Sequence, residues 1–226
     1  MNSKITLLTI LLITALFSCK QESQFTDFKY SEEPLAFKCE GTNSKLLNEA
    51  LYSFENDITN YYTKGAQQAS LSKAYSQILR NSIYGSLKLE DIVSKHTVSV
   101  FEALKKEDNL WDNGNSKSHL NYNSATLKCI SNSIYDKNIK TTLNALLSTN
   151  SMAPKLFGPA IASRYKNALK DKNLAMYIAL DLFYAKMFDV DFTKVNFDKP
   201  EEPVDFNKLP SVDQKPVVDP HAGHNH

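Results

Sequence analysis

The sequence predicts an all-α protein: a compact bundle of about seven helices that ends in a proline-rich tail. From Asn43 onward, apolar residues recur with the 3.6-residue period of a helix that is buried on one side. Residues 43–190 show no sustained alternation of apolar and polar residues, which a half-buried strand would produce. No internal repeat of fixed period is present, and this favours a compact bundle over a solenoid.

The first three predicted helices lie in the N-terminal half of the chain. The first runs from Asn43, whose side chain can accept a hydrogen bond from a first-turn amide, to Gly65. The next two cover 71–85 and 89–104, and a stretch with strong turn chemistry follows at 108–116.

Four further helices are predicted over about 121–135, 137–149, 159–170 and 173–189. The sixth begins at Pro159, because proline suits the first turn of a helix. The seventh is apolar over most of its circumference, which predicts that it lies buried at the centre of the bundle.

Composition excludes two classes of function. The chain has 26 Lys+Arg and 25 Asp+Glu, so it lacks the basic excess that is typical of a nucleic-acid-binding protein. Its 6 glycines are widely scattered, whereas phosphate-binding loops need several glycines within one turn. We therefore expect neither a nucleic-acid partner nor a nucleotide-binding loop.

The N-terminus has the features of a secretory signal peptide over residues 1–18. Lys4 supplies the positive charge, and residues 5–17 form a mostly apolar stretch that is too short for a stable membrane span. Cys19 follows directly. An ordinary signal peptide with a chance cysteine is the alternative interpretation.

The four residues Leu16, Phe17, Ser18 and Cys19 resemble the lipobox of bacterial lipoproteins. The resemblance implies that cleavage leaves Cys19 as the first residue, with acyl chains such as palmitate attached to it. Phe17 is bulkier than the residue usual at its position. The implied location is the cell envelope, at the outer membrane, with the periplasmic face and the cell surface both open.

Segments of the body resemble uncharacterised helical lipoproteins of Bacteroidota-type Gram-negative bacteria. They are AFKCEG, LYSFENDITNYY, NALLSTNSM and LAMYIALDLFYAKMFDVDF, and the resemblance covers most of 36–192. It implies a helical class and an envelope address, and it implies no activity.

These observations divide the chain into four parts: a signal peptide (1–18), a lipidated cysteine and spacer (19–41), a helical domain (42–192) and a proline-rich tail (193–226). The spacer shows no sustained period, and we expect it to dock at most partly on the body. As a flexible chain it would span about 25 Å root-mean-square. The tail has no core of its own.

Two cysteines, Cys39 and Cys129, remain once Cys19 carries lipid. An exported protein meets oxidising surroundings, so the pair predicts a disulfide that ties the spacer to the fourth helix. The alternative is two buried free thiols, since Cys129 lies on an apolar helix face.

The tail ends in a histidine cluster, His221, His224 and His226. Imidazole suits Cu(II), Ni(II) and Zn(II), and three of them on a flexible tail can close around one ion. This cluster is the candidate metal site.

Three residues of the body are candidates for chemistry. Asp181 sits in the apolar seventh helix and needs water or a partner, such as Arg164 or His96. His96 is either a buried base or ligand, or a histidine hydrogen-bonded at the core edge. His119, expected near the start of the fourth helix, is either a general base or a solvated residue. No G-x-S-x-G or H-E-x-x-H motif is present.

The sequence therefore predicts a lipid-anchored envelope lipoprotein that acts as a binding or structural module, and not an enzyme of recognisable motif. Its membrane contact is the lipid, and its partner is an envelope protein or ligand. Two alternatives stay open: a metal-handling lipoprotein that uses the histidine cluster, and an enzyme built around His96 and Asp181.

Overall fold

The computed structural model describes residues 25–66, 68–195 and 197, and this part of the chain is all-α as predicted. Its α-helices are α2 (Ser44–Tyr62), α3 (Leu71–Tyr84), α4 (Leu89–Ile92), α5 (Lys95–Leu104), α6 (Ala125–Ser133), α7 (Lys137–Ser148), α8 (Pro154–Ala162) and α9 (Lys172–Leu182). The 3-10 segment η2 (Tyr165–Leu169) lies between α8 and α9, and two more, η3 (Tyr184–Asp189) and η4 (Phe192–Lys194), follow α9. The described residues contain no strand, only an isolated bridge between Trp111 and Leu120.

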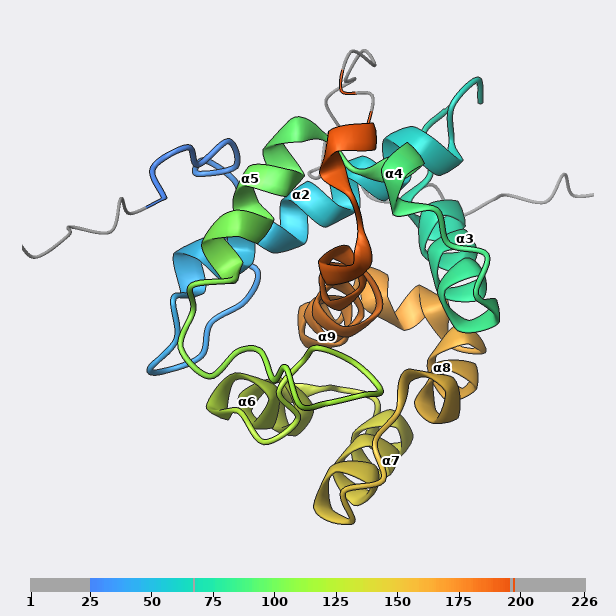
Figure 1. Cartoon of the computed structure of the whole chain (residues 1–226). Helices are drawn as coiled ribbons and strands as arrows, with labels where there is room; N and C mark the ends of the chain where they lie inside the picture. Colours follow the sequence, from blue (N-terminus) through green and yellow to red (C-terminus); the bar gives the residue numbers. More distant parts are fainter. Residues whose placement is uncertain (1–24, 67, 196, 198–226) are drawn as a thin grey trace, which may run out of the picture.

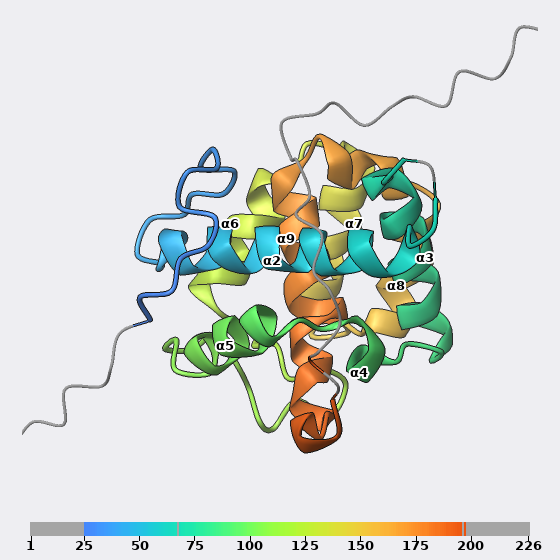
Figure 2. The ribbon, with the colours of Figure 1, turned by 90° about the horizontal axis from the view of Figure 1, so that it is seen from above.

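Helix α9 is the axis of the fold. Figure 1 shows it end-on, with the other helices arranged around it. Every residue from Leu174 to Leu182 is buried, as its apolar circumference predicted. Helix α2 crosses α9 in Figure 2 and packs against it.

Local sequence signals set many of the helix ends. The side chain of Asn43 accepts a hydrogen bond from the Leu46 amide at 3.2 Å, so the predicted N-cap is confirmed. Helix α3 ends at Gly85, whose φ of +74° is left-handed and favours glycine. Gly65, predicted as the end of the first helix, instead follows α2, which stops at Tyr62.

The predicted third helix, 89–104, is wrong in one respect, because it is two helices. The chain is extended at Val93, and Ser94 then starts α5 by accepting a hydrogen bond from the Thr97 amide. The Ser94 amide donates to Asp57 of α2 at 2.8 Å. A contact with another helix therefore replaces the hydrogen bond that a continuous helix would have made.

The predicted sixth and seventh helices are also corrected. Helix α8 begins at Pro154, so Pro159 lies inside it, and the chain beyond it continues as η2. Helix α9 stops at Leu182, whose carbonyl accepts a hydrogen bond from Ser82 of α3 at 2.8 Å, and the chain continues as η3.

The predicted spacer is packed onto α2 from Phe25 onward, so it is not a free linker. Glu49 of α2 accepts hydrogen bonds from the amides of Lys29 and Tyr30, at 2.8 and 3.1 Å. The Asn48 side chain makes two hydrogen bonds with the backbone of Phe37: it accepts one from the amide and donates one to the carbonyl. Backbone groups of an irregular segment thus find their partners in side chains of one helix.

A disulfide fastens the far end of this segment. It joins Cys39, which is buried, to Cys129 of α6, and the two Cα atoms lie 6.1 Å apart. The bridge spans 90 residues of sequence. Cys19, the signal peptide and the tail beyond Phe197 lie outside the described residues.

Candidate functional site

Asp181 in α9 is one of the buried carboxylates of the fold. It is 1% exposed and accepts hydrogen bonds from three hydroxyl groups. The Ser118 and Tyr122 hydroxyls donate to Oδ1 at 2.6 and 3.1 Å, and the Tyr177 hydroxyl donates to Oδ2 at 2.7 Å. Three hydroxyl donors offset much of the cost of burying the carboxylate.

Lys186 of η3 carries the nearest opposing charge. Burial raises the pKa of Asp181, and the three hydroxyls and the Lys186 ammonium offset the rise only in part. Burial likewise lowers the pKa of Lys186, although Asp181 favours its charged form. The Lys186 ammonium donates to the Ser82 carbonyl at 2.7 Å. Two ionisable groups with opposed pKa shifts therefore border one hollow, a feature common at functional sites.

This hollow has a volume of about 560 Å³ and lies beside the loop that joins α5 to α6. Its apolar lining includes Leu87, Leu89 and Val190. Its polar lining includes residues of the loop from Asn113 to His119. A hollow that combines apolar surface with a few hydrogen-bonding groups is typical of a small-molecule site. We name it the Asp181 pocket.

His119 lines the Asp181 pocket but is not placed to activate Ser118. It lies in a turn before α6 and not near the helix start, since α6 begins at Ala125. Its ring stacks on Phe188 with centroids 4.6 Å apart, and its Nε2 lies 3.5 Å from Asp189. Its buried Nδ1 has no hydrogen-bond partner in the described part of the chain. The arrangement supplies no Ser–His pair for nucleophilic catalysis.

His96 belongs to a different cluster. Its Nε2 lies 2.6 Å from Glu49 of α2, and its Nδ1 lies 3.4 Å from Asp27. Burial opposes a charge on His96, but the two carboxylates outweigh it and raise its pKa. No described hydrogen bond joins His96 to Asp181, so the predicted pairing is not made. Arg164, the other predicted partner, lies 3.6 Å from Asp136 instead.

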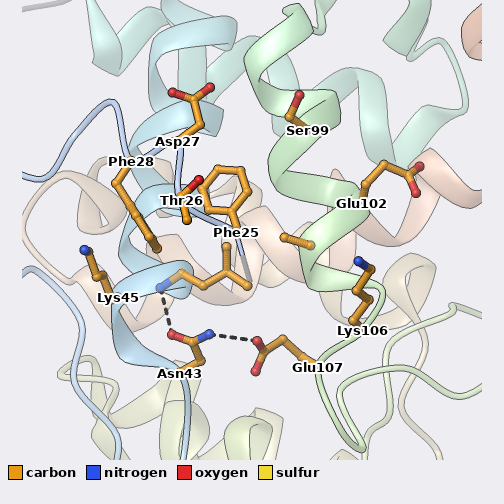
Figure 3. A pocket seen from close by; sticks show the side chains of 12 residues that line it. Phe25, Thr26, Asp27, Phe28, Asn43, Lys45, Ser99, Glu102, Lys106 and Glu107 are labelled. Carbon is orange, nitrogen blue, oxygen red and sulfur yellow. Dashed lines mark hydrogen bonds between the residues drawn. The ribbon is translucent and has the colours of Figure 1, made fainter. Parts of the chain in front are cut away.

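A second hollow, of about 760 Å³, lies between the N-terminal segment, the start of α2 and the end of α5. Figure 3 shows its lining, with Phe25 and Phe28 on one side and Lys106 and Glu107 on the other. The Asn43 side chain closes one end by donating to Glu107 at 2.8 Å. We name it the N-terminal groove.

The partners of Asp181 include one that sequence reasoning missed although its spacing was available. Tyr177 lies four residues before Asp181, so both side chains lie on one face of α9. Ser118 and Tyr122 come from a loop about 60 residues away, and no local pattern indicates them.

The predicted metal site, His221, His224 and His226, lies outside the described residues. Within 25–66, 68–195 and 197, no group of three or more metal-ligating side chains comes together. In the same part of the chain, none of the helices has the length and hydropathy that crossing a bilayer requires. Comparison with protein-family models, with curated proteins and with solved structures found no match for the chain.

Proposed function

We propose that this protein is a lipid-anchored, exported binding module of the cell envelope, with the Asp181 pocket as its ligand site. The observation that carries the proposal is the pocket itself. A fully buried carboxylate, a half-buried ammonium and several hydroxyl and amide groups line it together with apolar side chains.

Export and anchoring are supported by the sequence around Cys19 and by the disulfide between Cys39 and Cys129. Disulfides persist in oxidising compartments outside the cytosol. Two or three acyl chains on one cysteine provide stable anchoring, whereas a single chain is marginal.

The pocket suits a small polar ligand that carries amine or hydroxyl groups. The exposed Glu90 offers an acceptor, and Lys186 and Lys117 offer donors, while the buried Asp181 carboxylate holds the Ser118 hydroxyl at the pocket. The Ser118 hydroxyl donates to the buried Asp181 carboxylate, and no described hydrogen bond pairs it with a histidine, so we propose binding and not turnover.

Anchoring is tested with Cys19→Ser. This variant should accumulate as an unlipidated precursor and leave the membrane fraction, and labelled palmitate should not be incorporated. Membrane association that persists in the variant, without labelled lipid in the wild type, would refute the anchor.

Ligand binding is tested with a panel of monosaccharides, amino acids and polyamines, by thermal shift and ligand-observed NMR. Glu90→Gln keeps the fold because Glu90 is exposed, and it should weaken a bound amine about tenfold. The matched control Glu32→Gln removes an exposed carboxylate outside the pocket and should leave binding unchanged. Equal weakening by both variants, or no ligand in the panel, would count against the pocket.

Metal handling by His221, His224 and His226 is the second candidate function. It is favoured by the H-x-x-H-x-H spacing, which places three of the 5 histidines within six residues. Copper, nickel or zinc would bind through neutral imidazole nitrogens.

A further inference from the structure

The folded body begins close to the proposed lipid anchor. Phe25, the first described residue, is six positions after Cys19. Six fully extended residues span at most about 20 Å, whatever path they follow. The packing of 25–41 onto α2 therefore leaves only residues 20–24 between Cys19 and the described body, which limits how far the body can lie from a lipid on Cys19.

Phe25 also lines the N-terminal groove, so the groove lies within this short reach of the lipid. Its apolar lining includes Phe28, Leu46 and Ala103. The Phe25 and Phe28 rings meet edge to face, with centroids 5.0 Å apart. Apolar aromatic rings beside charged side chains form an amphipathic surface, which is suited to the boundary between headgroups and acyl chains.

The charged side chains of the groove differ in whether they already have a partner within the protein. Two of its three carboxylates are paired with basic side chains, Asp27 with His96 and Glu102 with Lys105. The third, Glu107, accepts a hydrogen bond from the neutral Asn43 amide and keeps its charge, so the two lysines of the groove outnumber the one carboxylate without a basic partner.

The two lysines of the groove are free to meet an anion. The Lys45 ammonium lies 3.9 Å from the centre of the Phe28 ring, a contact that leaves its charge uncompensated. Lys106 makes no side-chain hydrogen bond or ion pair with the described part of the chain. Figure 3 shows the two lysines on opposite sides of the groove.

We propose that the N-terminal groove binds the headgroup phosphate of an anionic membrane phospholipid, through Lys45 and Lys106, with Phe25 and Phe28 at the membrane interface. The inference rests on the anchor in the proposed function. Removal of Lys4 with the signal peptide leaves 26 − 1 = 25 basic and 25 acidic residues. Attraction to the membrane therefore comes from this local arrangement and not from net charge.

The test uses the full mature chain with Cys19→Ser, which carries no acyl chain, and vesicles of phosphatidylglycerol and phosphatidylethanolamine in equal parts. Flotation should show binding that weakens with salt and is absent from phosphatidylcholine vesicles. Lys45→Gln and Lys106→Gln should each reduce binding about fivefold. Lys137→Gln is the matched control, because Lys137 is exposed on α7, away from the N-terminal segment (Figures 1 and 2).

No vesicle binding, or equal loss in the Lys137→Gln control, would overturn the proposal. Inorganic phosphate is the second arm. If it shifts the NMR signals of the groove as strongly as the vesicles do and competes with them, the site takes a free anion and not a lipid. Palmitate labelling of the wild type is read separately, so a failed anchor and a failed groove are distinguishable.

Discussion

Helices α2 and α9 are both buried almost throughout, but by opposite means. From Leu174 to Leu182, α9 buries apolar side chains with the exception of Asp181. From Leu46 to Thr59, α2 buries every residue, and half of its circumference is polar. An apolar helix needs only other apolar surfaces, whereas a buried polar face needs a specific partner for each group.

The partners of α2 come from four separate segments. Glu55 accepts from the Tyr75 hydroxyl at 2.7 Å and from the Lys172 ammonium at 2.7 and 2.9 Å. Asp57 accepts from the Ser94 amide, and Glu49 accepts from the N-terminal segment and from His96. Helix α2 therefore holds distant parts of the chain in place through hydrogen bonds, whereas α9 holds them mainly through apolar packing.

The largest expected effect on stability follows from removing the disulfide that fastens the N-terminal segment over α2. Replacing Cys39 and Cys129 with Ser should reduce the free energy of unfolding by about 4–5 kcal/mol, the chain-entropy value for a loop of 90 residues. Urea unfolding would measure it. In the wild type, thiol counting under denaturing, non-reducing conditions should find neither thiol free.

Hydrogen exchange sharpens this test. The Lys29 and Tyr30 amides, held by Glu49, should exchange much faster in the double variant, and amides in the middle of α9 should not. Two free thiols in protein purified from the envelope would contradict the prediction.

The next largest effect on stability is expected from the ion pair between Glu55 of α2 and Lys172. Lys172→Met leaves Glu55, which is 0% exposed, without its ammonium partner, and should cost about 3–5 kcal/mol of stability. Glu55→Gln added to Lys172→Met should recover much of the loss, since a neutral amide oxygen can still accept from Tyr75. Both are measured by urea unfolding.

The matched substitution in α9 is Leu180→Ala. It should cost about 2–5 kcal/mol through the cavity it leaves, and no single change in a neighbouring charge should restore it. The distinction between the two helices would be wrong if a change in a neighbouring charge restored the stability of Leu180→Ala. It would also be wrong if Glu55→Gln did not restore stability to Lys172→Met.

A smaller effect should follow the protonation of His96. Its pKa is raised in the folded protein, so its contribution to stability is fully present below the unfolded pKa of about 6.5 and is lost as pH rises through the folded value. We expect about 1.5–3 kcal/mol, the scale of a hydrogen bond to a charged group. Urea unfolding from about pH 5.5 to about pH 9 should show this loss in the wild type and not in His96→Asn.

The smallest effect on stability is expected from the tail. Deleting 219–226 should abolish most binding of Cu(II) or Zn(II) and leave the melting temperature nearly unchanged. Metal binding in the full chain should weaken below about pH 6, because a ligand imidazole must lose its proton. Calorimetry on both chains would show it. Equal affinity in both would move the metal site to His96 and His119.

Several helix ends could be predicted because their signals are local. Asn43 caps α2 and Gly85 ends α3 through groups within one turn of the helix end. The breaks at Ser94 and after Leu182 were missed because their decisive partners, Asp57 and Ser82, are far away in sequence. The periodicity of apolar residues along one helix does not indicate hydrogen-bond partners that lie so far away in the sequence.

The candidate site divides in the same way. Asp181 lies in an apolar helix, so the sequence indicates that its carboxylate needs partners. The spacing of four residues between Tyr177 and Asp181 could also have indicated that these two side chains meet. Ser118 and Tyr122 were not, because a loop between α5 and α6 delivers them. His96 was one of the alternative partners considered for Asp181, and it is instead hydrogen-bonded to Glu49 of α2 and Asp27 of the N-terminal segment.

The sequence by itself determined the all-α class, the caps at Asn43 and Gly85 and the central place of α9, since these follow from periodicity, capping chemistry and an apolar circumference. Only the tertiary structure decided what covers the polar face of α2, which hydroxyls reach Asp181, and that the segment from Phe25 is part of the body. The physical reason is that apolar burial is non-directional and can be inferred from composition along one helix. A buried polar group is satisfied only by a particular donor or acceptor at hydrogen-bond distance, and the fold alone brings the two together.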